Sequence, residues 1–282
     1  MAFKKLDGTD VPDKYSVIDD FNRQGDVGQS IVAMFEIDPD DGKWAATGTG
    51  FFVAKDILIT ARHVFEHKFS LKRSYAWDGS DPDAKEAAQV FRHVIVQQSA
   101  DGTHEIRQVI RSVMSARADI CMVKVEPAKV AGQPCLPLTG KLPQVGDTVF
   151  TYAFPESTIV EDGKKREIWL NGGFYRGIVH EVSLSGIGTM TPWQNFRVDF
   201  HIHGGASGGP VFNASGRVVG INCTSFDGQT DLSFVTSIGS DRELGFDDLD
   251  ELEDGNVHLT INELVKAGDA KMPPWKHNKA RR

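Results

Sequence analysis

Cysteine is scarce in this sequence of 282 residues, and its scarcity excludes two kinds of stabilisation. The residues present are Cys121, Cys135 and Cys223, an odd number without the spacing of metal ligands. We therefore expect buried thiols, with neither a disulfide framework nor a cysteine-bound metal. The N-X-S/T sequons at Asn213 and Asn222 are accordingly not expected to carry sugar.

Long apolar runs are also missing. The chain contains no stretch of about 18 apolar residues, the length that would span a membrane. Its start, "MAFKKLDGTDVPDKYSV", is polar where a signal peptide needs an apolar stretch. We therefore expect a cytoplasmic protein with no membrane partner.

A surplus of positive charge is absent as well, because 31 Lys and Arg stand against 39 Asp and Glu and the net charge is −8. Affinity for phosphate backbones comes largely from clustered Lys and Arg, so a nucleic-acid partner is not expected. The basic tail "WKHNKARR" is the exception, and we interpret it as a solvated terminus. Hydrophobic residues at 40% and charged residues at 25% fit an ordinary globular protein.

Short β-branched and aromatic segments separated by turn residues dominate what is present. Typical ones are "SIVAMFEI", "DILITA" and "DICMVKVE", followed after the connector "PAKVAGQPCLPLTGKLPQVGD" by "TVFTYAF", "NFRVDFHI" and "GRVVGINCTS". This spacing predicts an antiparallel all-β sandwich or barrel architecture, and the connector suggests two such units. Near the end, "LTINELVKAG" has the apolar spacing of a short helix, with Gly268 as its expected stop.

The predicted layout has four parts. An N-terminal extension covers residues 1–29, a first β unit with His63 and Asp119 covers 30–140, and a second with Ser207 covers 141–240. Residues 241–282 hold an acidic stretch, the short helix and the basic tail.

The stretch "HGGASGGPVFN" carries most of the chemical information. Glycines on both sides leave the hydroxyl of Ser207 unobstructed and allow backbone N–H groups to point at a common site. On its own such a stretch is more often a turn between strands. Two further segments change that balance, because "TARHV" places His63 after a strand-like run and "ARADICMVKV" places Asp119 before one. A nucleophilic serine needs a histidine base, and that base needs a carboxylate to orient it.

With these residues in view, the chain resembles the trypsin-like (chymotrypsin-fold) serine peptidases, whose triad order matches His63, Asp119 and Ser207. The resemblance is stronger to the bacterial HtrA-like and glutamyl-endopeptidase branches. It rests on "GTGFFVAKDILITARHV", "LPLTGKLPQVGDTVFTYAFP" and "GPVFNASGRVVGIN", and it extends over about residues 30 to 240. No PDZ-like segment is evident.

The resemblance implies two antiparallel six-stranded β-barrels with the triad in the cleft between them. It also implies a serine endopeptidase that acts on protein or peptide substrates through an acyl-enzyme, with no metal or organic cofactor. The N–H groups of Gly205 and Ser207 would form the oxyanion hole. The substrate pocket would be lined by His201, Asn222, Cys223 and Thr224.

One position departs from the digestive members of that family. They carry an acid before the serine, which pairs with a newly cleaved N-terminus, whereas this chain has Ala206. Activation by N-terminal insertion is therefore not expected, and regulation would fall to the extension, the acidic stretch or a partner protein.

Three alternatives stay open at this point. The G-x-S-x-G pattern also occurs in α/β-hydrolases, but their order of serine, acid and histidine would require His258 or His277, and alternating helices are missing. His201 and His203 would share one side of a strand and could bind a metal, yet no third ligand is evident. The last alternative is a catalytically silent homologue that binds peptides or proteins.

Overall fold

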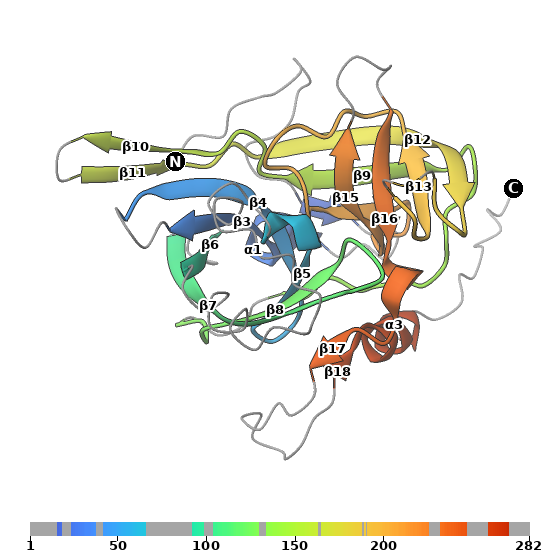
Figure 1. The fold of residues 1–282 in the computed structure, drawn as a ribbon, viewed down its shortest axis with the longest axis horizontal. Helices are drawn as coiled ribbons and strands as arrows, with labels where there is room; N and C mark the ends of the chain where they lie inside the picture. Colours follow the sequence, from blue (N-terminus) through green and yellow to red (C-terminus); the bar gives the residue numbers. More distant parts are fainter. Residues whose placement is uncertain are drawn as a thin grey trace, which may run out of the picture.

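Most of the described chain is strand. The computed structural model describes residues 16–18, 24–37, 42–65, 92–98, 104–129, 134–162, 165–187, 189, 191–225, 232–246 and 259–270. Within these residues the strands form two closed barrels that lie against each other (Figure 1).

The first barrel closes in the order β3, β4, β5, β8, β7, β6, with antiparallel neighbours throughout. Its interior is mainly apolar, because β3, β4, β5 and β8 contribute runs of buried aliphatic and aromatic side chains, whereas β7 contributes the buried Arg107, which bonds to Gln97 and Asp56. The strands are β3 (Ile31–Ile37), β4 (Trp44–Ala54), β5 (Ile57–Thr60), β6 (Arg92–Gln98), β7 (His104–Met114) and β8 (Cys121–Val125).

The second barrel closes in the order β12, β13, β16, β15, β14, β9, again antiparallel. Its strands are β9 (Thr148–Ala153), β12 (Gly173–Ser183), β13 (Asn195–Val198), β14 (Pro210–Asn213), β15 (Val218–Ser225) and β16 (Ser233–Ser237). In β12 buried and more exposed positions alternate, as expected for a strand with one face on a core.

One apolar cluster continues from the first barrel into the second. Phe52 and Val64 of the first barrel belong to the same cluster as Tyr152, Phe154 and Ile221 of the second. Because protein interiors are close-packed, a shared core of this kind holds the two barrels in one relative position. Groups contributed by opposite barrels can therefore meet with fixed geometry at the boundary between the barrels, which we call the seam.

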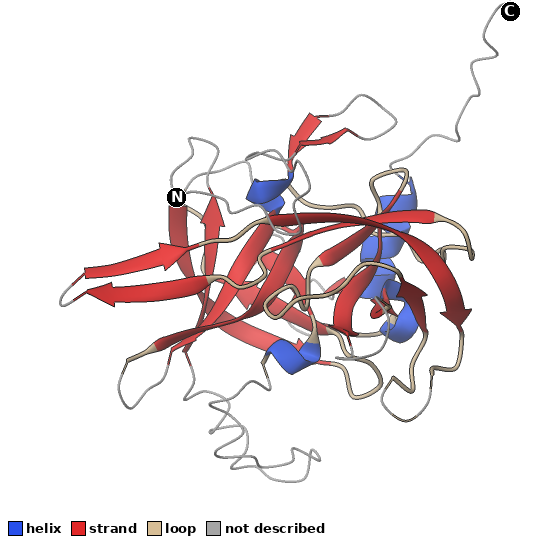
Figure 2. Ribbon diagram, turned by 90° about the horizontal axis from the view of Figure 1, so that it is seen from above, coloured by secondary structure: helices blue, strands red, loops and turns tan. Residues whose placement is uncertain are grey.

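The remaining elements lie outside the barrels. The hairpin of β10 and β11 projects away from the body, and the C-terminal helix lies beside the second barrel (Figures 1 and 2). Their bounds are β1 (Ser16–Ile18), β2 (Gln24–Asp26), α1 (Val27–Ser30), η1 (Arg62–Val64), β10 (Thr158–Asp162), β11 (Lys165–Trp169), η3 (Ile238–Asp241), β17 (Gly245–Phe246), β18 (Leu259–Thr260) and α3 (Ile261–Ala270). None of the helices in this part of the chain is long and apolar enough to cross a membrane.

The expected all-β fold of two six-stranded antiparallel barrels with a short C-terminal helix is confirmed. It excludes the α/β-hydrolase alternative, which requires a parallel sheet. All barrel strands lie within the predicted ranges 30–140 and 141–240, while the exact boundaries stay predictions. The acidic stretch from residue 247 on, the basic tail and both His258 and His277 lie outside the described residues.

Two local expectations are wrong. Gly268 does not stop the helix, which continues to Ala270. A glycine stands there because a Cβ at this position would strike the carbonyl oxygen of Leu138, so the helix packs directly onto the connector backbone. The cysteines all carry thiols as expected, but Cys135 is exposed, because it lies in the connector rather than in a barrel wall.

Candidate active site

The pairing of β5 with β8 brings His63 and Asp119 together. Thr60 at the end of β5 pairs with Cys121 at the start of β8. Because the strands are antiparallel, the chain leaving β5 and the chain entering β8 lie at the same end of the barrel. His63 follows in the short helix η1, and Asp119 lies two residues before β8.

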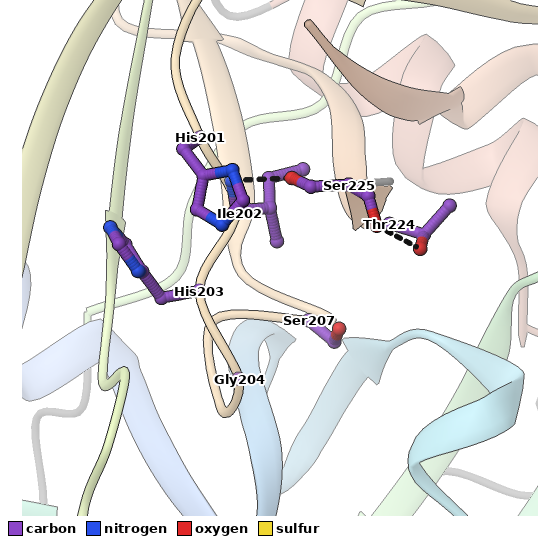
Figure 3. Close-up of a pocket in the computed structure, with 7 residues that line it drawn as sticks. All are labelled: His201, Ile202, His203, Gly204, Ser207, Thr224 and Ser225. Carbon is purple, nitrogen blue, oxygen red and sulfur yellow. Dashed lines mark hydrogen bonds between the residues drawn. The ribbon is translucent and has the colours of Figure 1, made fainter. Parts of the chain in front are cut away.

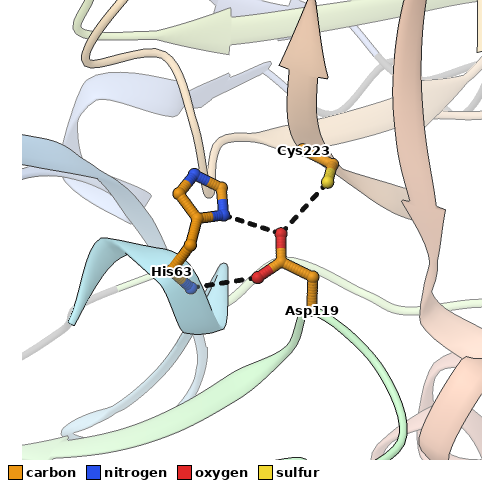
Figure 4. Close-up of side chains that lie close together, drawn as sticks. All are labelled: His63, Asp119 and Cys223. Atoms are coloured by element: carbon orange, nitrogen blue, oxygen red, sulfur yellow. Dashed lines mark hydrogen bonds and ion pairs between the residues drawn. The ribbon is translucent and has the colours of Figure 1, made fainter. Parts of the chain in front are cut away.

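His63 and Asp119 make two hydrogen bonds. The Nδ1 atom of His63 lies 2.7 Å from Oδ2 of Asp119, and the backbone N–H of His63 donates to Oδ1 at 3.0 Å (Figure 4). Burial by itself would raise the pKa of Asp119, but the hydrogen bonds and charge of His63 outweigh it and hold that pKa below its usual value. The carboxyl group is therefore ionised at neutral pH and only accepts hydrogen bonds. The proton consequently sits on Nδ1, which leaves Nε2 free to accept another.

Cys223, on β15 of the second barrel, contacts the same carboxylate. Its thiol donates to Oδ2 of Asp119 at 3.1 Å (Figure 4). Burial raises the pKa of this thiol well above its usual value, and the negative charge of Asp119 adds to the effect. Cys223 is therefore a protonated donor and a poor nucleophile. Sequence reasoning missed this role, because the contact joins residues 104 positions apart across the barrel seam.

Ser207 lies in the loop between β13 and β14, beside the seam. Its hydroxyl donates to the backbone carbonyl of Cys223 at 3.1 Å. Among the described residues no hydrogen bond joins this hydroxyl to His63. In this structure the serine hydroxyl is therefore bonded to a backbone carbonyl rather than to His63, and catalytic hydrogen bonds are commonly looser in unliganded proteins.

Hydrogen bonds hold successive carbonyls of the loop from residue 204 to 207, which we call the oxyanion loop. The Gly204 carbonyl accepts from the N–H of Glu156 at 2.8 Å, and the Ala206 carbonyl accepts from Nδ2 of Asn222 at 3.2 Å. Gly205 has φ +89°, a left-handed conformation that favours glycine. The N–H groups of Gly205 and Ser207 have no acceptor among the described residues, so both can bind an outside oxygen.

A pocket opens next to Ser207. Among the predicted pocket residues, His201 and Thr224 line it, together with Ile202, His203, Gly204 and Ser225 (Figure 3). No described residue that lines this pocket carries a carboxylate.

The other two predicted pocket residues have their side chains elsewhere. Asn222 is fully buried and donates from Nδ2 to Ala206 and to the hydroxyl of Thr151, at 3.2 and 2.8 Å. Cys223 has its sulfur against Asp119 rather than in the pocket.

Two histidines of the pocket wall lie side by side, with the ring centroids of His201 and His203 4.6 Å apart. They have no third metal-ligating side chain beside them in the described part of the chain. There, the group close enough to share a metal ion consists of His63, Asp119 and Cys223. Hydrogen bonds already account for the short distances within that group.

Comparison with known proteins places these observations in a family. The family model described as the trypsin-like peptidase domain matches residues 48–221. No curated protein matches the chain. Among solved structures, an active-form Rv3671c protease from M. tuberculosis aligns with a TM-score of 0.52 and 16% identity, covering 76% of this chain and 78% of that one. Deg5 aligns with a TM-score of 0.51 and 19% identity, covering 75% and 84%. These likenesses concern the fold.

Proposed function

The chain belongs to the trypsin-like peptidase family, and on that premise we propose that it cleaves peptide bonds through a triad of His63, Asp119 and Ser207. Membership makes it a serine endopeptidase with protein or peptide substrates. The observation that carries the proposed triad is the ionised, buried Asp119 bonded to Nδ1 of His63 beside a glycine-flanked serine.

In the proposed mechanism the hydroxyl of Ser207 turns toward Nε2 of His63 and attacks the substrate carbonyl. His63 takes the hydroxyl proton and then gives it to the leaving amine, while its Nδ1–H stays bonded to Asp119. The acyl-enzyme on Ser207 is then hydrolysed by water with the same histidine as base. All atoms of this cycle come from the protein, the substrate and one water molecule.

The N–H groups of Gly205 and Ser207 are the proposed donors to the oxyanion. Support comes from their lack of acceptors among the described residues and from the anchored carbonyls around them. Losing one donor of an oxyanion hole typically costs about 100- to 1,000-fold in turnover, so this loop is a large contributor to rate.

A second candidate function is peptide binding without catalysis. The observation that favours it is the hydrogen bond from the Ser207 hydroxyl to the Cys223 carbonyl, which gives the hydroxyl proton an acceptor other than His63. Peptide binding in the adjoining pocket does not require an activated serine, so it is compatible with a Ser207 hydroxyl bonded to the Cys223 carbonyl. Only a test of reactivity separates the two functions.

Labelling by a fluorophosphonate provides that test, because the reagent reacts with activated serines irrespective of substrate specificity. We expect the purified protein to be labelled at neutral pH and Ser207→Ala to be unlabelled, with casein hydrolysis lower by about a million-fold. The matched control is Ser215→Ala, which removes a hydroxyl from the turn after β14 and should label normally. Labelling that persists in Ser207→Ala excludes the proposed nucleophile, and no labelling of the unmodified protein supports the binding function.

The cytoplasmic location and a regulatory partner stay predictions. The first follows from the lack of long apolar stretches in the sequence, and the second from the Ala206 position.

A further inference from the structure

Thr49 of β4 makes the most extensive contact between the first barrel and the oxyanion loop. It is fully buried, and its backbone N–H donates to the carbonyl of Ser207 at 2.8 Å. Its hydroxyl donates to the carbonyl of Gly205 at 2.8 Å and accepts the N–H of Phe154 at 3.0 Å. One residue thus joins the oxyanion loop, the end of β9 and the barrel that carries His63.

The Thr49 hydroxyl acts at the most deformable point of the loop. The methyl group of Ala206 makes no hydrogen bond, and within its own segment the peptide between Gly205 and Ala206 is held by the Ala206 N–H, which donates to the His203 carbonyl at 3.0 Å. Rotation of this planar peptide would change ψ of Gly205 and φ of Ala206, and would thereby shift the neighbouring peptides that carry the N–H groups of Gly205 and Ser207. Glycine opposes such rotation less than any other residue. The Thr49 hydroxyl on the Gly205 carbonyl therefore holds the other side of this peptide, from the neighbouring barrel.

We propose that the Thr49 hydroxyl is a positioning group that keeps the oxyanion hole formed, by holding the Gly205 carbonyl from the neighbouring barrel. The proposal rests on the proposed peptidase function and explains how the hole forms although Ala206 cannot make an ion pair with a cleaved N-terminus. Because Thr49 and His63 belong to the same barrel, this hydrogen bond also fixes the position of the oxyanion hole relative to His63.

The test compares Thr49→Val, which keeps the branched shape and removes the hydroxyl, with Thr49→Ser, which keeps the hydroxyl. A control variant, Thr139→Val, removes another buried threonine hydroxyl, which accepts the N–H of Lys141 at 3.3 Å in the connector. The readouts are the rate constant of fluorophosphonate labelling, the kcat and KM for casein, and the midpoint of thermal unfolding. The phosphonyl oxygen of the reagent occupies the oxyanion hole, so labelling reports on the hole directly.

We expect Thr49→Val to lower both the labelling rate constant and kcat about 10- to 100-fold, less than the full loss of one donor, with KM changed by less than about threefold. Thr49→Ser should restore most of the rate, and Thr139→Val should label at the normal rate. If Thr49→Val does not fold, Thr49→Ala replaces it in the same comparison.

Two results would overturn the inference. One is a labelling rate constant of folded Thr49→Val that lies within about twofold of that of the unmodified protein. A change of that size is far smaller than the loss of rate when one oxyanion donor is removed. The other is an equal loss in Thr49→Ser and Thr49→Val, which would assign the effect to packing. Failure of the proposed function looks different, because the unmodified protein itself would then not be labelled.

Discussion

Replacing Asp119 by asparagine tests the proposed triad at a residue whose two carboxylate oxygens both accept hydrogen bonds. Oδ1 of Asp119 faces a backbone N–H, and Oδ2 faces Nδ1 of His63 and the thiol of Cys223. An asparagine has one oxygen and one NH2 group for these positions. Placing the NH2 group against the backbone N–H would set two donors against each other, so the oxygen must take that side. The NH2 group then faces Nδ1 of His63.

The physical consequence is the wrong histidine tautomer. With an NH2 donor opposite, Nδ1 must become an acceptor, and the ring proton moves to Nε2. A histidine protonated at Nε2 cannot take the proton of Ser207. In a serine peptidase of this mechanism the same replacement lowers kcat about 10,000-fold, which corresponds to about 5.4 kcal/mol of transition-state stabilisation. We expect a loss of this size here.

The assay is the rate of fluorophosphonate labelling and of casein hydrolysis at neutral pH, with circular dichroism to verify folding. The matched control is Asp199→Asn, because Asp199 also contacts a histidine, His180, at 3.2 Å, but both side chains are exposed. We expect that control to keep full activity. A folded Asp119→Asn protein with more than about a tenth of normal activity would refute the reasoning, since a wrong tautomer cannot leave so much.

Two remaining predictions concern stability and thiol chemistry. Gly208 has φ +85° and a Cβ there would strike the Thr49 carbonyl, whereas Gly146 has φ +92° with open space around it. Urea unfolding should therefore show a loss of about 1–2 kcal/mol for Gly146→Ala, from backbone strain alone, and a clearly larger loss for Gly208→Ala. Equal losses of unfolding free energy in the two variants would show that the backbone around Gly208 shifts to accommodate the added methyl group. Iodoacetamide at neutral pH should alkylate exposed Cys135 in the folded protein and leave Cys223 unmodified, as counted by mass spectrometry, because the raised pKa keeps that thiol protonated. Rapid modification of Cys223 would mean that the seam opens.

Much of the fold was predictable because its signals are local. Strand segments such as those at Ile57–Thr60 and Cys121–Val125 are short, apolar and bounded by turn residues, and the structure has strands there. The end of α3 was not predictable in the same way. Gly268 is a helix stop by local rules, and only the approach of the Leu138 backbone explains a glycine inside the helix.

In the candidate site, too, the reactive residues were predictable from the sequence, whereas the contacts of their neighbours were not. His63, Asp119 and Ser207 stand out in the sequence, because each is a chemically apt residue in a context that matches a known family. That resemblance places Cys223 and Asn222 in the pocket. In the structure their side chains contact Asp119 and the Ala206 carbonyl instead, contacts that join β15 to the first barrel and to the oxyanion loop.

The sequence by itself determined the two-barrel architecture, the family and the candidate reactive side chains, because alternation, turn residues and short motifs act over a few positions. Tertiary structure alone decided which groups surround those side chains. The thiol on Asp119 and the hydroxyl on the Gly205 carbonyl depend on contacts across the seam between the barrels, and the Ser207 hydroxyl meets the Cys223 carbonyl through the packing of the second barrel. Such contacts join residues more than 100 positions apart, or follow from packing that no local pattern encodes, so they exist only once the two barrels share a core.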